Sequence, residues 1–417
     1  MTSAKKRIVI TGVGVISPIG IGKEQYWQGL SEGRSGFRPI TLFDTARFKI
    51  KTGGEITDFD PVLFLGKKGL RDLDRSTKLL SAAAKLALED AHLGINEKNT
   101  DEIGISAGTT FGSINSISNF DKEALTEGPR MVNPSGFPNT VISSPASRAA
   151  IRFGIKGFNS TIATGMCSAL DAVDYAVNFI RSDRAKAVIA GSVEEMCEQL
   201  FLALSRLNWL SGLDNDEDPV SCPFDRRRNG IIFSEGASAI ILEELDYARE
   251  RGADIYGEIL GIGTSFDSYR AVKYNPKGTG MKEAMKLALS DAVLKAEDID
   301  YICANANSTK DADLIETSAI KEVFGEHAYK IPVTSVKSMI GETFSASGGL
   351  ATIATIGALN RGFVPPTINY KEKDERCDLN YLPNISKEAD IGKAMINSFD
   401  FFGNCTVLIV GKPESKK

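Results

Sequence analysis

A helix and the strand after it occur twice in this chain, about 200 residues apart. The segment KLALEDA at residues 85–91 returns as KLALSDA at residues 286–292. In both copies the apolar residues recur at helical spacing, and each copy precedes an apolar strand candidate, residues 103–107 in the first and 302–306 in the second. This order predicts a duplicated α/β unit.

Short apolar runs bounded by glycine or turn residues alternate with helical stretches along the rest of the chain. They predict strands at residues 7–11, 160–163, 187–190, 237–242, 332–335 and 406–410, with a helix over 169–180 among others. The pattern predicts an α/β protein in two halves, residues 1–255 and 256–417, with helices on both faces of the sheets. Because no linker rich in Pro, Gly or Ser separates the halves, we expect them to pack as one body.

Charge and hydropathy exclude several classes of function. The 417 residues include 49 basic and 54 acidic side chains, and a net charge of −5 gives no basis for binding nucleic acid or an anionic membrane. The chain has neither a long uncharged apolar run nor an apolar leader, so we expect a soluble, cytoplasmic protein. Its 6 cysteines include no CxxC pair, which predicts neither a metal site nor disulfides. The basic run at residues 226–228 is interpreted as a solvated turn rather than a contact for an acidic carrier protein.

The segment most informative for function is a predicted strand that turns through small residues into a helix, NSTIATGMCSALDA at residues 159–172. Such a turn presents one side chain and free backbone N–H groups at a helix N-terminus, which suits a nucleophile and an oxyanion. An ordinary strand-to-helix connection has the same pattern. The residues by themselves leave both interpretations open.

Motifs along almost the whole chain resemble the β-ketoacyl-ACP synthases of the condensing-enzyme, thiolase-like family. They are RIVITGVGVISPIG at residues 7–20, PFDR at 223–226, NG at 229–230, SEGA at 234–237, KSMIG at 337–341, VPPTIN at 364–369 and NSF at 397–399. The resemblance implies a duplicated thiolase-like fold with α-β-α-β-α layers. It is a stronger indication of fold than of activity.

None of the three catalytic positions implied by the resemblance keeps its catalytic residue. In active members the turn carries a nucleophilic cysteine, and two histidines stabilise the thioester carbonyl and support malonyl decarboxylation. Met166 stands at the cysteine position, and a thioether cannot form a thiolate. The histidine of an N-A-H-G-T-type motif is assigned to Asn305, and the second histidine position holds Glu342, whose carboxylate would repel an oxyanion. The only histidines, His92 and His327, are expected to face solvent.

Cys167, one residue beyond the expected nucleophile, gives an alternative interpretation. As a shifted nucleophile activated by the helix N-terminus, it would make the chain a stand-alone acyltransferase or a thioesterase-like enzyme. One step along a helix turns a side chain by about 100°, so a small buried residue is the favoured interpretation. A loading-type decarboxylase would keep the histidines, and Asn305 and Glu342 argue against it.

The pattern is similar to that of chain-length factors, the silent partner subunits of type II polyketide ketosynthases. Chain-length factors lack the cysteine, commonly carrying Gln there, and often continue into a GLDA-like helix start, which is ALDA at residues 169–172 here. The resemblance implies a heterodimer with an active ketosynthase, paired through an edge strand at about residues 158–163. It implies no cofactor, because an acyl carrier protein brings the substrate on its phosphopantetheine. The retained family residues Lys337 and Asp313 indicate that the fold has been kept for a partnership.

The resemblance also places a group of residues at the end of the substrate tunnel, near that interface. They are Thr110, Phe111, Gly112, Ile114, Asn115, Gly136, Phe137 and Pro138. A bulky Phe111 or Phe137 would stop a growing acyl chain, and each is equally compatible with an ordinary core aromatic. Phe401 stands at the family's gating position, where bulky neighbours replace glycines and predict a filled, static pocket.

Overall fold

The computed structural model describes residues 5–214 and 218–413, and within them a sheet of eleven strands runs across the molecule. The strands follow the order β11-β10-β14-β15-β9-β1-β8-β7-β5-β6, with β2 beside β1. They are β1 (Ile8–Ser17), β2 (Gly20–Ile21), β5 (Ile103–Gly108), β6 (Asn159–Ile162), β7 (Ala187–Glu194), β8 (Gly236–Glu244), β9 (Gly257–Phe266), β10 (Tyr301–Cys303), β11 (Val333–Thr334), β14 (Lys393–Phe399) and β15 (Asn404–Gly411). Parallel and antiparallel pairs both occur, for example β5 with β7 and β7 with β8.

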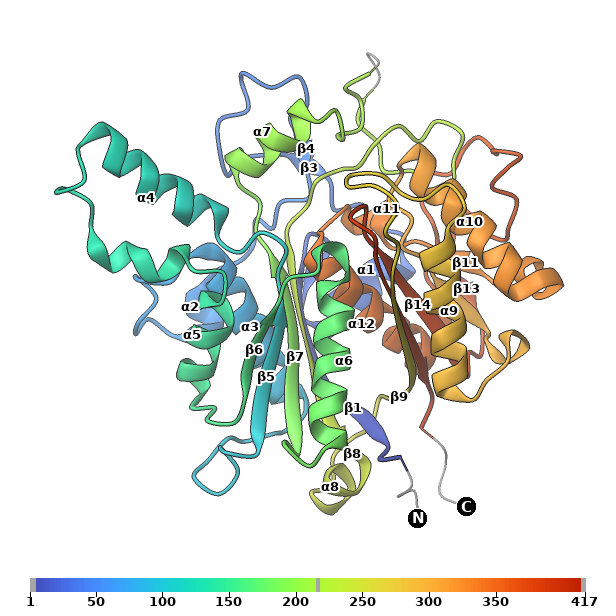
Figure 1. Ribbon diagram of the computed structural model, residues 1–417, viewed down its shortest axis with the longest axis horizontal. Helices are drawn as coiled ribbons and strands as arrows, with labels where there is room; N and C mark the ends of the chain where they lie inside the picture. The colour runs from blue at the N-terminus through green and yellow to red at the C-terminus, as the bar shows by residue number, and fades with distance from the viewer. Residues whose placement is uncertain (1–4, 215–217, 414–417) are drawn as a thin grey trace.

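The pairing between the two central strands of the sheet, β1 and β9, is short, and it divides the sheet into two wings. β9 pairs with β1 only at Ile8, Val9 and Ile10. One wing contains β1, β8, β7, β5 and β6, and the other contains β9, β15, β14, β10 and β11. Figure 1 shows β5, β6 and β7 on one side of α6 (Ser168–Arg181) and α12 (Ser345–Arg361), and β9 and β14 on the other.

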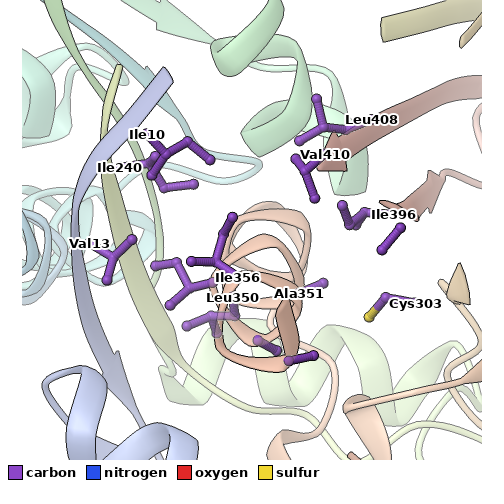
Figure 2. Close-up of a cluster of buried hydrophobic side chains, with 14 of the residues drawn as sticks. Ile10, Val13, Ile240, Cys303, Leu350, Ala351, Ile356, Ile396, Leu408 and Val410 are labelled. Atoms are coloured by element: carbon purple, nitrogen blue, oxygen red, sulfur yellow. The ribbon is translucent and has the colours of Figure 1, made fainter. Parts of the chain in front are cut away.

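Helix α12 is the centre of the hydrophobic core. Every residue from 345 to 359 is buried, because the helix packs against β7 and β8 of one wing and β14 of the other. In Figure 2 the α12 side chain Leu350 lies between Ile240 of β8 and Leu408 of β15. A helix that is apolar on all sides belongs in such a place.

Further helices cover the outer faces of both wings. α3 (Arg75–Asp90) packs on β1, β8 and β7 and against α5 (Ser144–Phe153), while α9 (Thr279–Ala292) packs on β9 and β15 and against α10 (Lys310–Phe324). Successive residues of the first wing point alternately toward α3 and toward α6 and α12. The resulting α-β-α-β-α layers confirm the predicted fold class.

The repeated helix makes equivalent contacts in the two wings. Asp90 at the end of α3 accepts a hydrogen bond from a backbone N–H of β1 at 2.9 Å, and Asp291 of α9 accepts one from β9 at 3.1 Å. A Cβ added at Gly14 of β1 or Gly263 of β9 would stand 1.9 or 2.2 Å from a carbonyl oxygen of the covering helix. The sequence repeat therefore corresponds to one helix-on-strand packing built twice.

The remaining elements are short or lie in connections. They are α1 (Lys23–Ser31), β3 (Arg38–Pro39), β4 (Thr52–Gly53), α2 (Pro61–Leu65), α4 (Ile114–Thr126), η1 (Pro134–Thr140), η2 (Gly165–Cys167), α7 (Glu198–Arg206), α8 (Leu245–Glu250), η3 (Ala296–Asp298), η4 (Gly325–Tyr329), α11 (Lys337–Ile340), β12 (Phe363–Val364) and β13 (Lys387–Glu388). Figure 1 shows α4 standing away from the body of the molecule. Within the described residues, no helix has the length and apolar character needed to cross a membrane.

Two of the surface predictions are wrong. Arg228 is only 1% exposed, and its guanidinium contacts Asp374 at 2.9 Å, because the turn at residues 226–228 folds inward at its last residue. His327 is half-buried, with its Nε2 atom 2.8 Å from the carbonyl oxygen of Ile299. His92 is exposed, as predicted.

Candidate active site

The predicted strand-to-helix turn connects β6 to α6 through η2. Gly165 has a φ of +62°, a backbone conformation that glycine adopts without strain. The Thr164 N–H donates to Ser168 Oγ at 3.0 Å, and this hydroxyl donates to the Gly165 carbonyl oxygen at 2.6 Å. These bonds fix the turn and place Met166 immediately before the helix.

Met166 occupies the centre of this turn with an uncharged thioether. It is 2% exposed and belongs to an apolar cluster that includes Phe344 and Phe401. The Tyr274 hydroxyl lies 4.0 Å from its sulfur, and the Met166 N–H donates to Asp400 Oδ2 at 3.1 Å. Because a thioether has no proton to lose, this position cannot form an acyl-enzyme.

Cys167 lies beside Met166 but points away from it into the protein. It is fully buried, and its Sγ donates to the carbonyl oxygens of Ser398 at 3.1 Å and Asn404 at 3.3 Å. Burial raises the pKa of this thiol well above its usual range, and the nearby Asp171 raises it further. These contacts weigh against Cys167 as a shifted nucleophile, since a reactive cysteine needs an accessible thiolate.

Glu342 and Lys337 form a buried ion pair at the second predicted catalytic position. Lys337 is 3% and Glu342 1% exposed, and the Lys337 Nζ lies 2.9 Å from Glu342 Oε2. The other carboxylate oxygen accepts the Phe344 N–H at 2.9 Å and the Ser347 hydroxyl at 2.7 Å. Each charged oxygen is therefore partnered within the protein, and neither is free to exchange a proton with a substrate.

The first histidine position belongs to Asn307, two residues beyond the predicted Asn305. Asn305 lies behind the site, where its Oδ1 accepts from Lys337 at 2.9 Å and its Nδ2 donates to the Phe399 carbonyl oxygen at 3.1 Å. Asn307 lines a cavity outside the turn, together with Met166, and donates to Glu342 Oε2 at 2.9 Å. Placed in register on residues 305–309, the third letter of the N-A-H-G-T motif also falls on Asn307. The sequence-based assignment to Asn305 is corrected accordingly.

Two further buried carboxylates hold the loop that carries these asparagines. Glu316 accepts the N–H groups of Asn305 at 2.9 Å and Ala306 at 2.7 Å, and burial raises its pKa to about 7. Asp313 accepts the Asn307 N–H at 3.0 Å, and burial raises its pKa to about 6. Asp313, which the sequence analysis named as a retained family residue, thus holds the loop through Asn307, whereas Glu316 was missed because nothing in its helical surroundings marks it.

A cavity of about 500 Å³ lies outside the turn, with Met166 and Asn307 at its inner end. Trp209, Tyr274 and Phe401 line it, and the Phe401 ring meets Trp209 with centroids 4.5 Å apart. The space beside Phe401, which the sequence predicted to be filled, is open. Sequence motifs missed Trp209 and Tyr274 because both lie in irregular connections.

The predicted tunnel residues separate into two groups. Phe111 and Ile114 pack against the cluster that contains Met166, and the Phe111 ring meets Phe344 with centroids 5.1 Å apart. Thr110 and Gly112 flank Phe111, and the Thr110 hydroxyl donates to the Gly165 carbonyl oxygen at 3.0 Å.

The second group lies on the surface. Phe137 is 58% exposed in η1 and touches only Phe120 among aromatic rings of the described chain. Its neighbour Gly136 is half-buried and its neighbour Pro138 is exposed. Asn115 at the start of α4 is also exposed. Because Asn115, Phe137 and Pro138 are exposed, a tunnel wall formed by them needs a partner surface.

Glu194 at the end of β7 holds residues of the first group, and Glu195 directly after it holds Asn115 of the second. Glu194 accepts the N–H groups of Thr110 at 2.9 Å and Phe111 at 3.2 Å, and Glu195 accepts that of Asn115 at 3.2 Å. Burial raises the pKa of each glutamate to about 7. The sequence shows two adjacent acidic residues after an apolar strand, but the family motifs do not include them. Among the residues that the structure describes, no three metal-ligating side chains come together.

The two-wing fold and the turn before α6 define a thiolase-like condensing-enzyme architecture. Residues 5–248 match the family described as "Beta-ketoacyl synthase, N-terminal domain", and residues 256–371 match "Beta-ketoacyl synthase, C-terminal domain". The chain belongs to the β-ketoacyl synthase family.

Relatives of known sequence and structure resemble the chain over nearly its whole length. It is 37% identical over 409 residues to 3-oxoacyl-[acyl-carrier-protein] synthase 2 of Coxiella burnetii, covering 98% of this chain and 99% of that one. For the synthase of the same name from Synechocystis the identity is 39%, covering 98% of each chain.

Two solved structures resemble the fold closely. "The ishigamide ketosynthase/chain length factor" has a TM-score of 0.92 and 35% identity, covering 99% of this chain and 100% of that one. A type II polyketide synthase acyl-carrier protein in complex with its ketosynthase has a TM-score of 0.89 and 28% identity, covering 98% of this chain and 100% of the matched one.

Proposed function

We propose that this chain is a chain-length factor, a catalytically silent ketosynthase homologue that pairs with an active ketosynthase. The pair elongates a polyketide or polyene chain, bound to an acyl carrier protein, by decarboxylative condensation. The observation that carries the proposal is the buried ion pair between Lys337 and Glu342, next to a thioether at Met166. The nucleophile position holds a thioether, and the groups at the two histidine positions, Asn307 and Glu342, are hydrogen-bonded to each other.

The chemistry of condensation requires groups that this centre does not offer. A thiolate must attack the acyl thioester, and hydrogen-bond donors must stabilise the oxyanion and the enolate that decarboxylation leaves. Glu342 is an acceptor that is already hydrogen-bonded to Lys337 and Asn307. A negative charge that developed beside this carboxylate would be repelled rather than stabilised.

The β6 edge supports the pairing part of the proposal. Strand β6 ends the sheet, so within residues 5–214 and 218–413 one side of its backbone has no partner strand. Helix α5 packs beside β6 and leaves Ile151 80% exposed, while α4 stands farther out with η1 packed on it, and their Leu125 and Phe137 are 86% and 58% exposed. An open strand edge flanked by apolar side chains fits a partner that adds a strand and covers them.

Two of the similar solved structures support the pairing and a polyketide setting, whereas the relatives of known sequence are 3-oxoacyl-[acyl-carrier-protein] synthases. The description of one similar structure names a ketosynthase and a chain length factor together, and that of another names an acyl-carrier protein in complex with its ketosynthase. The same partners are proposed here, with Thr110 to Ile114 and η1 contributing to the tunnel end. The substrate arrives on the carrier protein's phosphopantetheine, so the chain needs no cofactor of its own.

Co-expression with an active ketosynthase, with an affinity tag on this chain only, tests the proposal. The purified sample is incubated with acyl- and malonyl-carrier protein, and acyl adducts are located by mass spectrometry. A one-to-one complex acylated only on the partner is expected. The M166L and C167S substitutions should change product formation by less than about twofold, because both nearly conserve side-chain volume. A homodimer acylated on Cys167 would overturn the proposal.

A further inference from the structure

The hairpin between β14 and β15 sends one carboxylate into the turn before α6. Asp400 is 3% exposed, its Oδ2 accepts the Met166 N–H at 3.1 Å, and its Oδ1 accepts the Phe402 N–H at 2.5 Å. The fit is close, since a Cβ added at Gly165 would stand 2.0 Å from Asp400 Oδ2. Glycine at position 165 thus leaves the space that the carboxylate fills.

A strand-to-helix turn of this kind attracts an anion. Its backbone N–H groups point out of the helix start, and the helix dipole adds positive potential there. In a condensing reaction the group drawn to such a place is the thioester carbonyl oxygen, which becomes an oxyanion on attack. The Met166 N–H is the donor that would meet it, and in this chain that donor is already engaged.

We infer that Asp400 is a built-in ligand of this turn, whose carboxylate takes the hydrogen bond that a substrate carbonyl oxygen would otherwise accept from the Met166 N–H. The inference deepens the proposed silent role and rests on it for its biological meaning. It adds that two separate features oppose condensation. Met166 supplies no nucleophile, and Asp400 occupies the position where an oxyanion would bind. A cysteine restored at position 166 would therefore still face an occupied turn.

A purely local role for Asp400 is the competing explanation. Its contact with the Phe402 N–H has the form of an Asx turn, which stabilises the hairpin between residues 400 and 403. That contact uses one carboxylate oxygen, however, and the second is directed at the Met166 N–H from a strand 234 residues away. A substitution that keeps the hairpin acceptor but removes the charge separates the two roles.

The surroundings of Asp400 are mostly apolar and include several acidic groups. Burial raises the pKa of its carboxyl group, the two backbone N–H donors lower it, and the charge of Glu342 raises it. Tyr274, Cys167 and Cys405 also face it, and the charge of Asp400 raises the pKa of all three. No cation contacts Asp400 among the described residues, so the turn's N–H group is its principal long-range partner.

The reactivity of a thiol introduced by M166C tests the inference in the full chain. Iodoacetamide labelling is followed against pH, and tandem mass spectrometry resolves position 166 from Cys167. We expect the thiol of M166C to have a pKa above its usual range. In the same background, D400A should lower that pKa by at least about one unit, because the N–H is freed and the charge removed. D400N should lower it less, because its carboxamide oxygen still occupies the turn.

Two results would overturn the inference: a pKa that D400A leaves unchanged, and equal shifts for D400A and D400N, which would assign the effect to charge alone. A measurement on the unaltered chain guards against a variant that does not fold. With ¹⁵N-methionine labelling, the Met166 amide proton should shift with pH as Asp400 titrates, and an amide insensitive to pH over the whole range in which the chain stays folded would contradict the contact. These readouts do not involve a ketosynthase, so their failure would leave the pairing test untouched.

Discussion

The centre of the molecule buries polar side chains, whereas the region of its β6 edge exposes apolar ones. At the centre Lys337, Glu342 and Asn307 are buried and hydrogen-bonded to one another. At the edge, Ile151 of α5 exposes 80% of its surface beside β6, which has a partner strand on one side only within the described residues, and Leu125 of the projecting α4 exposes 86%. Polar groups of the centre are thus partnered within the chain, whereas apolar side chains near the edge are left uncovered.

This difference fits the role proposed for the chain. An active centre keeps donors and acceptors available for a substrate, whereas a stable monomer blunts its sheet edges and covers apolar side chains. The chain shows the reverse in both places. A subunit that contributes a wall and an interface to a shared active site would combine these features. Substitutions at each region test whether the contrast holds.

The largest effect is expected from the K337M substitution at the centre. It leaves the Glu342 carboxylate buried without a cation, and breaking one side of a buried ion pair typically costs about 3–5 kcal/mol. Urea unfolding monitored by circular dichroism measures the loss. The matched double variant, K337M with E342Q, should recover most of it because no unpaired charge remains. Equal losses in the single and double variants would contradict the ion-pair explanation.

The T161P substitution tests the edge with the next largest effect. The β5 N–H groups of Ile105 and Thr109 donate to the carbonyl oxygens of Phe158 and Ile162, so the intervening N–H of Thr161 faces away from β5. Proline there removes a donor for an added strand while the ladder to β5 remains. We expect pairing with the ketosynthase to weaken by at least about 100-fold, or about 2.7 kcal/mol.

Isothermal titration of the tagged pair measures this affinity, and T161V is the matched control because it keeps the N–H and the branched shape. Unchanged affinity in T161P would place the interface elsewhere. Loss of the thermal transition in T161P alone would show that β6 depends on more than its ladder to β5.

The E194Q substitution links the two regions and has an intermediate effect that depends on pH. Burial raises the pKa of Glu194 to about 7, so the folded chain holds this proton more tightly than the unfolded chain does. Its contribution favours folding at low pH and is lost as pH rises from about 4.5 to about 7. Relative to E194Q, the free energy of unfolding should fall by about 1–3 kcal/mol across that range and stay level above it. A difference that is constant from pH 5 to 8 would contradict the raised pKa.

Much of the fold is readable in the sequence, because it depends on patterns between near neighbours. The repeated KLAL segment predicted the two covering helices, and the apolar runs predicted most strands of the sheet. β9 and β14 were missed. Glycines interrupt the apolar run of β9, and polar residues interrupt that of β14. Met166 and Glu342 were found because single letters depart from contiguous motifs.

The partners of these residues were not readable. Asp400 reaches Met166 from a distant hairpin, and only the folded chain brings them together. Arg228 belongs to a run of three arginines that resembles a solvated turn, and its burial depends on Asp374 from another connection. Asn305 and Asn307 differ by two positions in one loop, and only the cavity shows which of them faces the site. Long-range contacts of this kind have no periodicity in the sequence.

The smallest effect is expected from F111A, which tests whether the wall between centre and edge sets product length. The Phe111 ring packs against Phe344 and the cluster around Met166, and its backbone N–H is held by Glu194. Removing the ring should open space at the tunnel end without disturbing the ion pair. We expect the ratio of longer to shorter products of the reconstituted pair to rise about fivefold, which is about 1 kcal/mol. Liquid chromatography with mass spectrometry of the released chains measures the ratio.

I114A is the companion substitution, since Ile114 packs against the same cluster, and F137A probes the exposed group. If the wall is shared, F137A should lengthen the product only in the assembled pair and should leave the stability of the isolated chain unchanged. Product lengths that stay the same in all three variants would show that these side chains do not set the length of the product. The proposed pairing with a ketosynthase would not be affected by that result. The centre and the edge would then be connected through the interface alone.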